Sequence, residues 1–270
     1  KIGQRPIDVL VDITNYVMLS TGQPTHGFDM AHVAKGILVR QANAHENLTL
    51  LDGRELDLSI EDMLITDGEK AIALAGVMGG KLDSILPNTK KMVLELASFN
   101  GRSVRRSSQR HNVRTEASTR YEKSIDTQRV EDAMAMAHNL ITNLLPGSKL
   151  TAYGSAVREK TTSSKIRLSY DFLASRIGRE VYGEEIRSLL SPLGFKVLEE
   201  SDSEIYLEAP VWRSTGDVSL ADDIVEEIAR MIGYENFEYK APMVELNESI
   251  HQLDFDLARS LKAYLSFRAG

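Results

Sequence analysis

Two side chains in the first half of the sequence have the chemistry to form a polar site. His26 lies in the stretch TGQPTHGFD, and Glu95 interrupts the apolar run MVLELA at residues 92–97. An imidazole exchanges protons close to neutral pH, and a carboxylate removed from water can accept a hydrogen bond from a ligand. Each residue also has an ordinary interpretation: a loop histidine bonded to the backbone, and a glutamate on the solvated face of a strand.

The segment before His26 predicts a helix followed by a rigid loop. Six residues recur with the spacing of one helical face: Ile7, Leu10, Val11, Thr14, Val17 and Met18. Pro6 suits the first helical turn, and Gly22 supplies the exit. A residue before proline is pushed out of the α region, so Gln23 should be extended. We therefore expect a buried helix that holds His26 on a fixed turn.

Short strands joined by tight turns should follow. The Asp-Gly pairs at 52–53 and 67–68 favour the φ > 0 turns of hairpins. The expected strands are residues 37–40, 48–51, 55–58, 63–66 and 71–75. The segment GVMGG at 76–80 indicates a tight turn or a close approach of the backbone to another group. A phosphate-binding loop is disfavoured, because neither the dinucleotide-binding spacing nor a Walker lysine is present.

Glu95 lies in an expected strand whose two faces differ. Alternation puts Val93, Glu95 and Ala97 on one face, with Leu94 and Leu96 on the other. The carboxylate therefore either faces solvent or is buried with a role.

A basic stripe follows in an expected helix over residues 100–110. Its arginines are spaced i, i+3, i+4 and i+8, which places them on one helical face; they are Arg102, Arg105, Arg106 and Arg110. Arg114 follows shortly after. Such a stripe suits phosphates, and it is equally typical of a solvated face paired with acids. A long amphipathic helix is expected next, over 127–145.

Bulk composition restricts the class of protein. At 270 residues two domains are expected, and the net charge of −7 means that any RNA contact must be local. There are no cysteines, which excludes disulfides and thiolate metal sites and fits a reducing cytoplasm. No apolar run approaches the roughly 20 residues of a membrane span. The sequence begins without methionine, and we expect it to be part of something larger.

A second compact module is expected after a polar linker at 156–165. Its predicted elements are a strand at 166–168, helices at 170–177, 183–190 and 219–232, and a hairpin formed by 195–198 and 205–209. Helices followed by a hairpin resemble a winged-helix arrangement. Beyond residue 239 a further amphipathic helix is predicted from Ile250, Leu253, Leu257, Leu261 and Leu265.

An acidic cluster lies at the last helix of this module. Asp223, Glu226 and Glu227 are spaced i, i+3 and i+4, and Asp217 and Asp222 lie nearby. Carboxylates without histidine or cysteine suit Mg²⁺. Alternatively, acids near a helix N-terminus interact favourably with its dipole, although this does not explain an extension to Glu227.

Five motifs together resemble the β subunit of bacterial phenylalanyl-tRNA synthetase. They are RPIDVLVDITNYVMLSTGQPTHGFD, IALAGVMGG, VLELASFN, RTEASTRYEKSID and DVSLADDIVEEIARMIGY, in this order. The resemblance implies an α+β chain with a mixed or antiparallel-sheet B3/B4 tRNA-editing domain at 1–155. It also implies a linker at 156–165, a winged-helix-like B5 domain at 166–236, and the start of a catalytic-like domain at 237–270.

The resemblance also implies an editing site that hydrolyses Tyr-tRNA(Phe). By position, His26 and Glu95 match the editing-pocket residues and Gly79 the glycine turn; Thr115, Ala117 and Arg5 also match pocket positions. Thr25 and Gly27 depart from the usual neighbours of the histidine, which affects the shape of the pocket. Tyrosine exceeds phenylalanine by one hydroxyl, which an apolar site rejects only by about 10²-fold, so a second site with a polar partner is useful. The stripe from Arg102 to Arg114 is expected to bind tRNA phosphates.

Cofactors and partners follow from the same resemblance. Asp217, Asp223, Glu226 and Glu227 correspond to a Mg²⁺ site shared with an α subunit, and ATP is expected only in the complete α₂β₂ enzyme, which ligates phenylalanine to tRNA(Phe) in the cytoplasm. Two rival interpretations are a non-catalytic RNA-binding and subunit-assembly module, and a Mg²⁺-dependent phosphoesterase. The second is weaker, because no histidine or lysine lies near the carboxylates in sequence.

Overall fold

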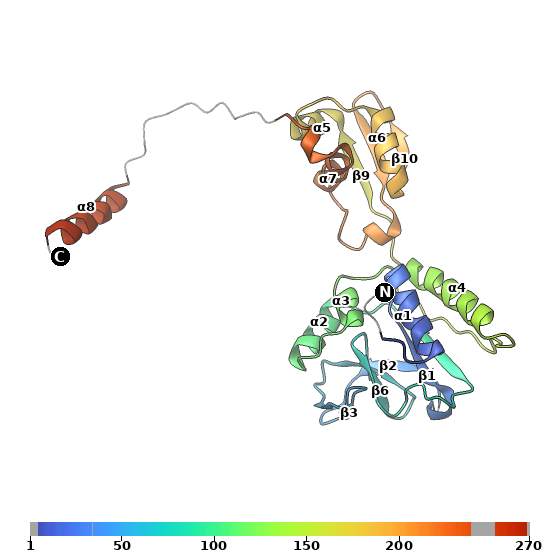
Figure 1. Cartoon of the computed structure of the whole chain (residues 1–270). Coiled ribbons are helices and arrows are strands. Elements are labelled where there is room, and N and C mark those ends of the chain that lie inside the picture. The colour runs from blue at the N-terminus through green and yellow to red at the C-terminus, as the bar shows by residue number, and fades with distance from the viewer. Residues whose placement is uncertain (1–4, 34, 239–251, 269–270) are drawn as a thin grey trace. The chain divides into compact units, whose positions relative to one another are not determined.

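The computed structural model describes residues 5–33, 35–238 and 252–268 (Figure 1). Residues 1–234 belong to one compact unit and residues 235–270 to a second. Helices are combined with antiparallel sheets, so the predicted α+β class is confirmed. The winged-helix likeness of the later module stays a prediction.

Helix α1 (Val9–Thr21) begins three residues after Pro6, which was predicted to lie in its first turn. Asp8 is the N-cap, and its carboxylate accepts a hydrogen bond from the Leu10 N–H at 2.9 Å, so Pro6 lies outside the helix. Gly22 ends the helix with φ of 76°, the left-handed conformation that favours glycine.

After Pro24 the chain forms a strand, not the loop that the sequence suggested. Strand β1 (Thr25–Asp29) pairs antiparallel with β8 (Met92–Leu96), and His26 lies opposite Glu95 in the register. The reason is long-range: β8 is far from β1 in sequence, and its backbone pairs with residues 25–29 and holds them extended. A short 3₁₀ turn, η1 (Met30–His32), follows β1.

Two further antiparallel assemblies complete the strands of this domain. One sheet has the order β2-β5-β6-β7, from Leu38–Gln41, Met63–Thr66, Ala71–Leu74 and Met78–Gly79. A hairpin joins β3 (Asn47–Thr49) to β4 (Glu55–Asp57). Both hairpins predicted from the Asp-Gly pairs are confirmed. The glycine-rich segment at 76–80 is only partly a turn: a tight turn at 75–77 leads into β7, and Gly80 forms an isolated bridge with Leu50.

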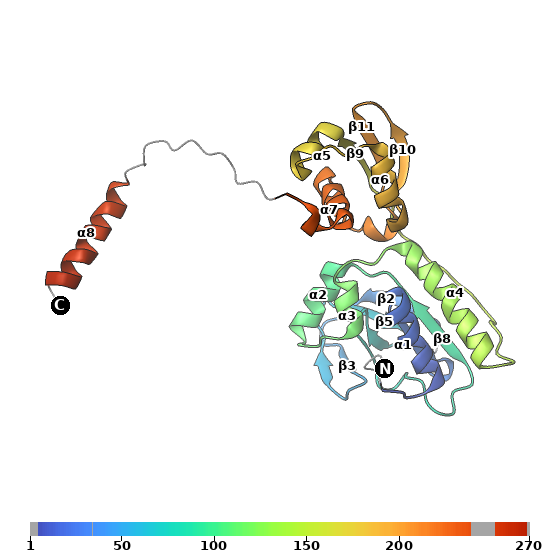
Figure 2. The same ribbon diagram turned by 45° about the horizontal axis from the view of Figure 1, so that its top comes forward.

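Helices cover the strands on two sides (Figures 1 and 2). Helices α2 (Gly101–Arg110) and α3 (Glu116–Tyr121) lie side by side, and α4 (Thr127–Leu144) packs along α1. The helices predicted over 100–110 and 127–145 are therefore present.

The β1–β8 ribbon separates two hydrophobic clusters. Leu94 and Leu96 pack against a cluster from α1 and α4 that contains Ile13 and Ala133. On the other face, Val93 and Ala97 pack against the main core. The alternation predicted for β8 is confirmed, and it places Glu95 on the face of the main core.

The later module has its own core. Its sheet has the order β10-β11-β9, formed by Lys196–Glu200, Glu204–Glu208 and Lys165–Ser169. Its helices are α5 (Tyr170–Ile177), α6 (Gly183–Leu190) and α7 (Ala221–Ile232), with 3₁₀ turns at Ser191–Leu193, Val211–Arg213 and Tyr234–Asn236. All three predicted helices and the hairpin are present.

Helix α8 (Leu253–Arg268) belongs to the second compact unit. It confirms the helix expected from the leucine spacing; Ile250, the first residue of that pattern, lies outside the described residues.

Candidate functional site

A small cavity of about 70 Å³ lies between the β1–β8 ribbon and the four-stranded sheet. Its walls come from β1, β5, β6, β7, β8, α3 and the turn before β7. They are lined by Pro24, Thr25, His26, Ile65, Ala73, Leu74, Gly76, Val77, Met78, Gly79, Glu95, Phe99, Ala117 and Tyr121. Most of these side chains are apolar, so the few polar groups are in a poorly solvated environment.

The cavity brings His26 and Glu95 together. They are directly opposed in the antiparallel ribbon, where side chains on one face have Cβ atoms about 5 Å apart. His26 Nε2 and Glu95 Oε1 are both buried without a hydrogen-bond partner. Unpaired buried polar atoms are costly, which points to a ligand that supplies the missing bonds.

Burial shifts the pKa of both side chains in opposite directions. It raises the pKa of Glu95 to about 7 and lowers the pKa of His26 to about 4. Desolvation disfavours the charged form in each case. The imidazole is therefore neutral near pH 7, while Glu95 changes its charge there.

Glu95→Gln should reveal this burial cost as a change in pH-dependent stability. The folded protein holds a proton on Glu95 up to about pH 7, whereas the unfolded chain releases it near 4.5, so stability falls as pH rises between these values. The variant should be more stable than the wild type at pH 8, by on the order of 2–3 kcal/mol, and the gain should disappear near pH 4. Denaturant unfolding at both pH values measures it; an equal gain at both would contradict the prediction. The opposite contribution of His26 is common to both proteins and cancels.

Gly79 allows the backbone of β7 to approach His26. A Cβ at this position would lie 2.5 Å from both Cε1 and Nε2 of the imidazole. Phe28 packs on the ring from another side, with centroids 4.6 Å apart at 75°. The backbone at Gly79 thus closely approaches the His26 side chain, as predicted for the glycine-rich segment at 76–80.

Sequence reasoning missed Tyr121 and Gln23. The Tyr121 hydroxyl donates to Pro24 O at 3.3 Å, and Gln23 Nε2 donates to Pro24 O at 2.9 Å and to Ala97 O at 2.8 Å. Burial, and next the Glu95 charge, raise the pKa of Tyr121 well above its ordinary value, so its phenol is neutral. Tyr121 lies within the motif RTEASTRYEKSID, but a single tyrosine in a short helix gives no sign of where it points.

The other predicted pocket residues differ in their placement. Ala117 lines the cavity. Thr115 is not a lining residue; it caps α3, and its hydroxyl donates to Val77 O at 2.7 Å, which fixes the cavity-lining turn. Arg5 is exposed and does not line the cavity.

The arginine stripe divides into two parts. Arg110 pairs with Glu61 and with Asp62, a fully buried carboxylate that also bonds Ser107 Oγ at 2.6 Å. Arg114 pairs with Glu122 at 3.3 Å. The remaining three, Arg102, Arg105 and Arg106, are exposed on α2, and no ion pair is found for them among the described residues.

The acidic residues of the later module do not form a ligand set on their own. Arg213 bonds Glu227 at 2.6 Å and also contacts Asp217, and Arg230 contacts Glu227 from the other side. Asp223 accepts the N–H groups of Ser219 and Leu220 at the start of α7. In the described part of the chain, no group of three or more histidine, cysteine, aspartate or glutamate side chains is arranged to hold a metal ion. Asp217 and Glu227 are paired with arginines and Asp223 is bonded to backbone N–H groups, so the described residues do not by themselves present these carboxylates as Mg²⁺ ligands.

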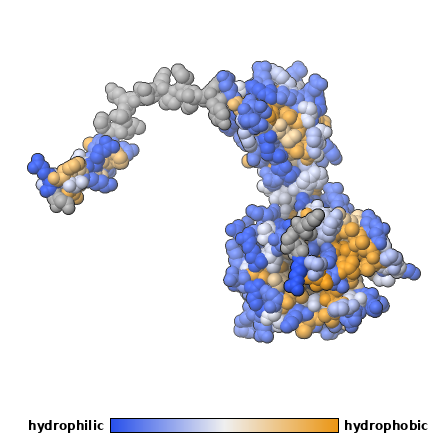
Figure 3. Space-filling model, in the orientation of Figure 1, coloured by the Kyte–Doolittle hydropathy of each residue, from blue (hydrophilic) through white to orange (hydrophobic). Residues whose placement is uncertain are grey.

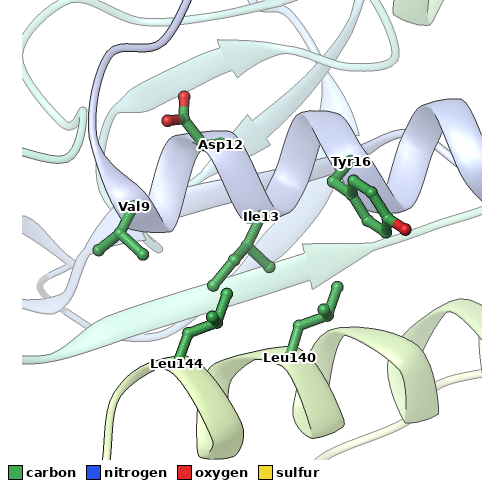
Figure 4. Close-up of a pocket in the computed structure, with 6 residues that line it drawn as sticks. All are labelled: Val9, Asp12, Ile13, Tyr16, Leu140 and Leu144. Atoms are coloured by element: carbon green, nitrogen blue, oxygen red, sulfur yellow. The ribbon is translucent and has the colours of Figure 1, made fainter.

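A larger groove between α1 and α4 lacks comparable chemistry. It is lined by Val9, Asp12, Ile13, Tyr16, Leu140 and Leu144, and Figure 4 shows Asp12 pointing away from the leucines. Its carboxylate accepts the Ile7 N–H at 3.0 Å. Figure 3 shows hydrophobic surface gathered over this side of the domain. None of the described helices is long and apolar enough to cross a bilayer.

Two family models match the chain. One described as a B3/4 domain matches residues 1–146, and one described as a tRNA synthetase B5 domain matches residues 166–234. The exact limits of the two domains stay a prediction.

Curated relatives match about nine tenths of the chain. The phenylalanine–tRNA ligase β subunit of Streptococcus mutans serotype c is 41% identical over 241 residues, covering 89% of this chain and 30% of the relative. That of Lactobacillus johnsonii is 39% identical over 243 residues, covering 90% and 30%. The chain thus spans about 30% of the length of these relatives. A solved N-terminal fragment of the phenylalanyl-tRNA synthetase β subunit from Pyrococcus horikoshii is 15% identical with a TM-score of 0.41, covering 83% of this chain and 65% of that chain.

Proposed function

The chain belongs to the family of phenylalanine–tRNA ligase β subunits, and from this premise we propose that its first domain removes tyrosine wrongly attached to tRNA(Phe). The reaction is hydrolysis of the ester between the amino acid and the terminal ribose. The observation that carries the proposal is the unpartnered Glu95 carboxylate beside His26 in an apolar cavity.

Glu95 supplies the selection. Tyrosine has a phenolic O–H that can donate to the buried Oε1, and phenylalanine has none. With phenylalanine in the cavity, the acceptor stays unpaired, at a cost of about 1–3 kcal/mol, or more when Glu95 is charged. This explains why a glutamate occupies the inner face of an otherwise apolar strand.

His26 orients the reacting water. Its neutral imidazole accepts a hydrogen bond from water through Nε2 in the tautomer protonated on Nδ1. Water adds its oxygen to the ester carbonyl carbon, the bond to the ribose oxygen breaks, and that oxygen leaves with a proton from the water. A neighbouring ribose hydroxyl of the tRNA assists the proton transfer. The sequence contains none of the common motifs of a covalent nucleophile, so a positioned water is the simplest mechanism.

Deacylation of Tyr-tRNA(Phe) tests the proposal. The chain, and the complete two-subunit enzyme, should hydrolyse this ester faster than the buffer does, and His26→Ala should slow the reaction. The rival function, a non-catalytic RNA-binding and assembly module, is favoured by the exposed arginines of α2. Binding of tRNA with hydrolysis no faster than in buffer, for both preparations, would establish the rival and reject editing.

Arg102, Arg105 and Arg106 are proposed to contact tRNA phosphates. Changing all three to glutamine should weaken tRNA binding by about tenfold at physiological salt and reduce the slope of log Kd against log salt by about two to three. Because no ion pair is found for these arginines within the described part of the chain, stability should change little. Filter binding over a salt series measures the effect.

A charge-matched control uses arginines of the later module. Arg167, Arg176 and Arg179 are exposed, and each pairs with an acid. Their triple change to glutamine should leave the salt dependence unchanged. Equal losses in the two triple variants would mean that net charge, and not α2, governs tRNA affinity.

The location, partner subunit and overall reaction of the whole enzyme are also proposals. We propose that the chain acts in the cytoplasm as part of an enzyme with an α subunit, in an α₂β₂ assembly, which joins phenylalanine to tRNA(Phe) with ATP. Any Mg²⁺ at Asp217, Asp223, Glu226 and Glu227 would need ligands from the partner and displacement of Arg213 from Glu227. We assign no chemical step of the editing reaction to this Mg²⁺.

A further inference from the structure

The backbone hydrogen bonds of the β1–β8 ribbon show which opposed residues are bonded to each other. Met30 N–H donates to Lys91 O at 2.9 Å, one residue beyond the paired strands on each side. In an antiparallel ribbon, opposed residues alternate between pairs that exchange backbone hydrogen bonds and pairs that do not. We call a bonded pair a rung. Counting back in steps of two residues makes His26 and Glu95 a rung.

The next rung toward α1 cannot form from the backbone alone. In the same register it would join Pro24 to Ala97, and a proline has no N–H to donate to Ala97 O. The pairing of the two strands accordingly ends at Thr25. Gln23 supplies a donor instead: its side-chain Nε2 donates to Ala97 O at 2.8 Å and to Pro24 O at 2.9 Å. One amide group thus bridges the two strands where the backbone rung is missing.

The burial of Gln23 shows that its donors are what the site uses. The side chain is fully buried, and within the described residues its Oε1 has no hydrogen-bond partner. A buried unpaired oxygen costs free energy, which a hydrocarbon side chain of the same length would avoid. Exchange of the oxygen and the nitrogen would place Oε1 against two carbonyl oxygens, so the bonds themselves fix the orientation of the amide. Nε2 also donates to Tyr121 Oη at 3.3 Å, and Tyr121 lines the cavity.

We propose that Gln23 is a positioning residue for the editing reaction, because its amide replaces the missing rung and thereby holds His26 opposite Glu95. The inference rests on the proposed editing function and adds to it a residue that does not line the cavity. Without the Gln23 amide, the rung of His26 and Glu95 is the last one at this end of the ribbon. The ends of a hydrogen-bonded ladder open most easily, so the two side chains would lose their fixed separation.

Gln23→Met in the complete two-subunit enzyme tests the proposal. The variant keeps the length of the side chain and removes both N–H donors. A misplacement near 1 Å can cost about 10²-fold in rate, so kcat for deacylation of Tyr-tRNA(Phe) should fall by about tenfold or more. KM should change by less than about threefold, since the apolar walls remain. Attachment of phenylalanine to tRNA(Phe) by the same preparation corrects for the amount of folded enzyme. An unchanged corrected kcat would overturn the inference.

A second substitution separates positioning from lost packing. Pro24→Ala restores a backbone N–H at the missing rung, and this group can donate to Ala97 O when the Gln23 amide is absent. Gln23→Met should therefore cost at least about threefold less in the Pro24→Ala background than in the wild type. The comparison is between two costs, so any effect of Pro24→Ala alone cancels. Equal costs in the two backgrounds would overturn the inference.

Amide hydrogen exchange follows the ribbon without any substrate. In Gln23→Met, the backbone amides of His26 and Glu95 should exchange about tenfold or more faster than in the wild type. The amide of Met30, at the other end of the ribbon, should exchange at its wild-type rate. Equal acceleration at both ends would mean that the whole fold is destabilised, and would overturn the inference.

A matched control variant lies in the later module. Ser214 Oγ accepts the Ser164 N–H at 2.9 Å and donates to Pro210 O at 2.9 Å. Ser214→Ala removes these two hydrogen bonds outside the cavity lining, and it should keep the wild-type kcat for deacylation. Equal losses of kcat in Ser214→Ala and Gln23→Met would assign the effect to general destabilisation and overturn the inference.

Deacylation by the wild type separates this inference from the proposed function. If the wild-type enzyme hydrolyses Tyr-tRNA(Phe) no faster than buffer does, editing is rejected, and with it a role for Gln23 in editing. If the wild type clears the ester and Gln23→Met clears it equally fast, editing stands and the positioning role is wrong.

Discussion

Glu95→Ala is expected to remove most of the discrimination between tyrosine and phenylalanine while leaving ester hydrolysis in place. In the wild type, phenylalanine leaves the buried Oε1 unpaired, at a cost of about 1–3 kcal/mol or more. Without the carboxylate this cost disappears for phenylalanine, and the favourable bond disappears for tyrosine. The ratio of kcat/KM for Tyr-tRNA(Phe) over Phe-tRNA(Phe) should therefore fall by roughly 10- to 100-fold.

The measurement compares deacylation of both esters by the wild type and the variant. Glu199→Ala, on the exposed face of β10, is a control for removal of one negative charge outside the cavity lining. A variant that edits tyrosine with unchanged selectivity would show that Glu95 is not the specificity residue. A variant that loses hydrolysis of both esters equally would instead give the carboxylate a role in the chemical step.

Gly79→Ala is expected to reduce Tyr-tRNA(Phe) deacylation by about 100-fold or more. The new methyl group would lie 2.5 Å from two atoms of the His26 ring, a distance at which something must move. Phe28 blocks one direction of escape, and it belongs to the main core. A displacement near 1 Å in a positioning group can cost about 10²-fold in rate.

Two comparisons make the Gly79→Ala result specific. Gly154→Ala adds the same methyl group where nothing lies within 4 Å, so it should be neutral in activity. In the His26→Ala background, adding Gly79→Ala should cost much less than it does in the wild type, because the clashing ring is gone. Equal losses in both backgrounds would mean that the methyl group acts on the fold and not on His26.

Local chemistry made much of the fold predictable. The Asp-Gly pairs at 52–53 and 67–68 each turn the chain between two strands that follow one another in sequence. Gly22 ends α1 because it adopts a positive φ. Alternation in β8 correctly gave its two faces, because each face meets a different hydrophobic cluster. These features depend on a few adjacent residues.

Long-range pairing was the part that sequence alone did not predict. The stretch after Pro24 has too few apolar residues to indicate a strand, and β1 forms because β8 supplies its partner. The burial of Asp62, which recruits Arg110 from the end of α2, is equally invisible to helical spacing. Residues His26 and Glu95 could be selected from the sequence, but the contacts of Gly79 and Tyr121 depend on the tertiary structure.

The double-sided packing of the β1–β8 ribbon has a consequence for protein engineering. The ribbon face opposite the cavity carries Leu94 and Leu96 against α1 and α4, so a shift of His26 and Glu95 would require repacking of that cluster. Directed evolution toward bulkier mischarged amino acids should therefore accumulate changes on the facing wall, around Met78 and Ala117, and spare the ribbon. The ribbon would act as the constant frame of such a library, and the opposite wall as its variable part.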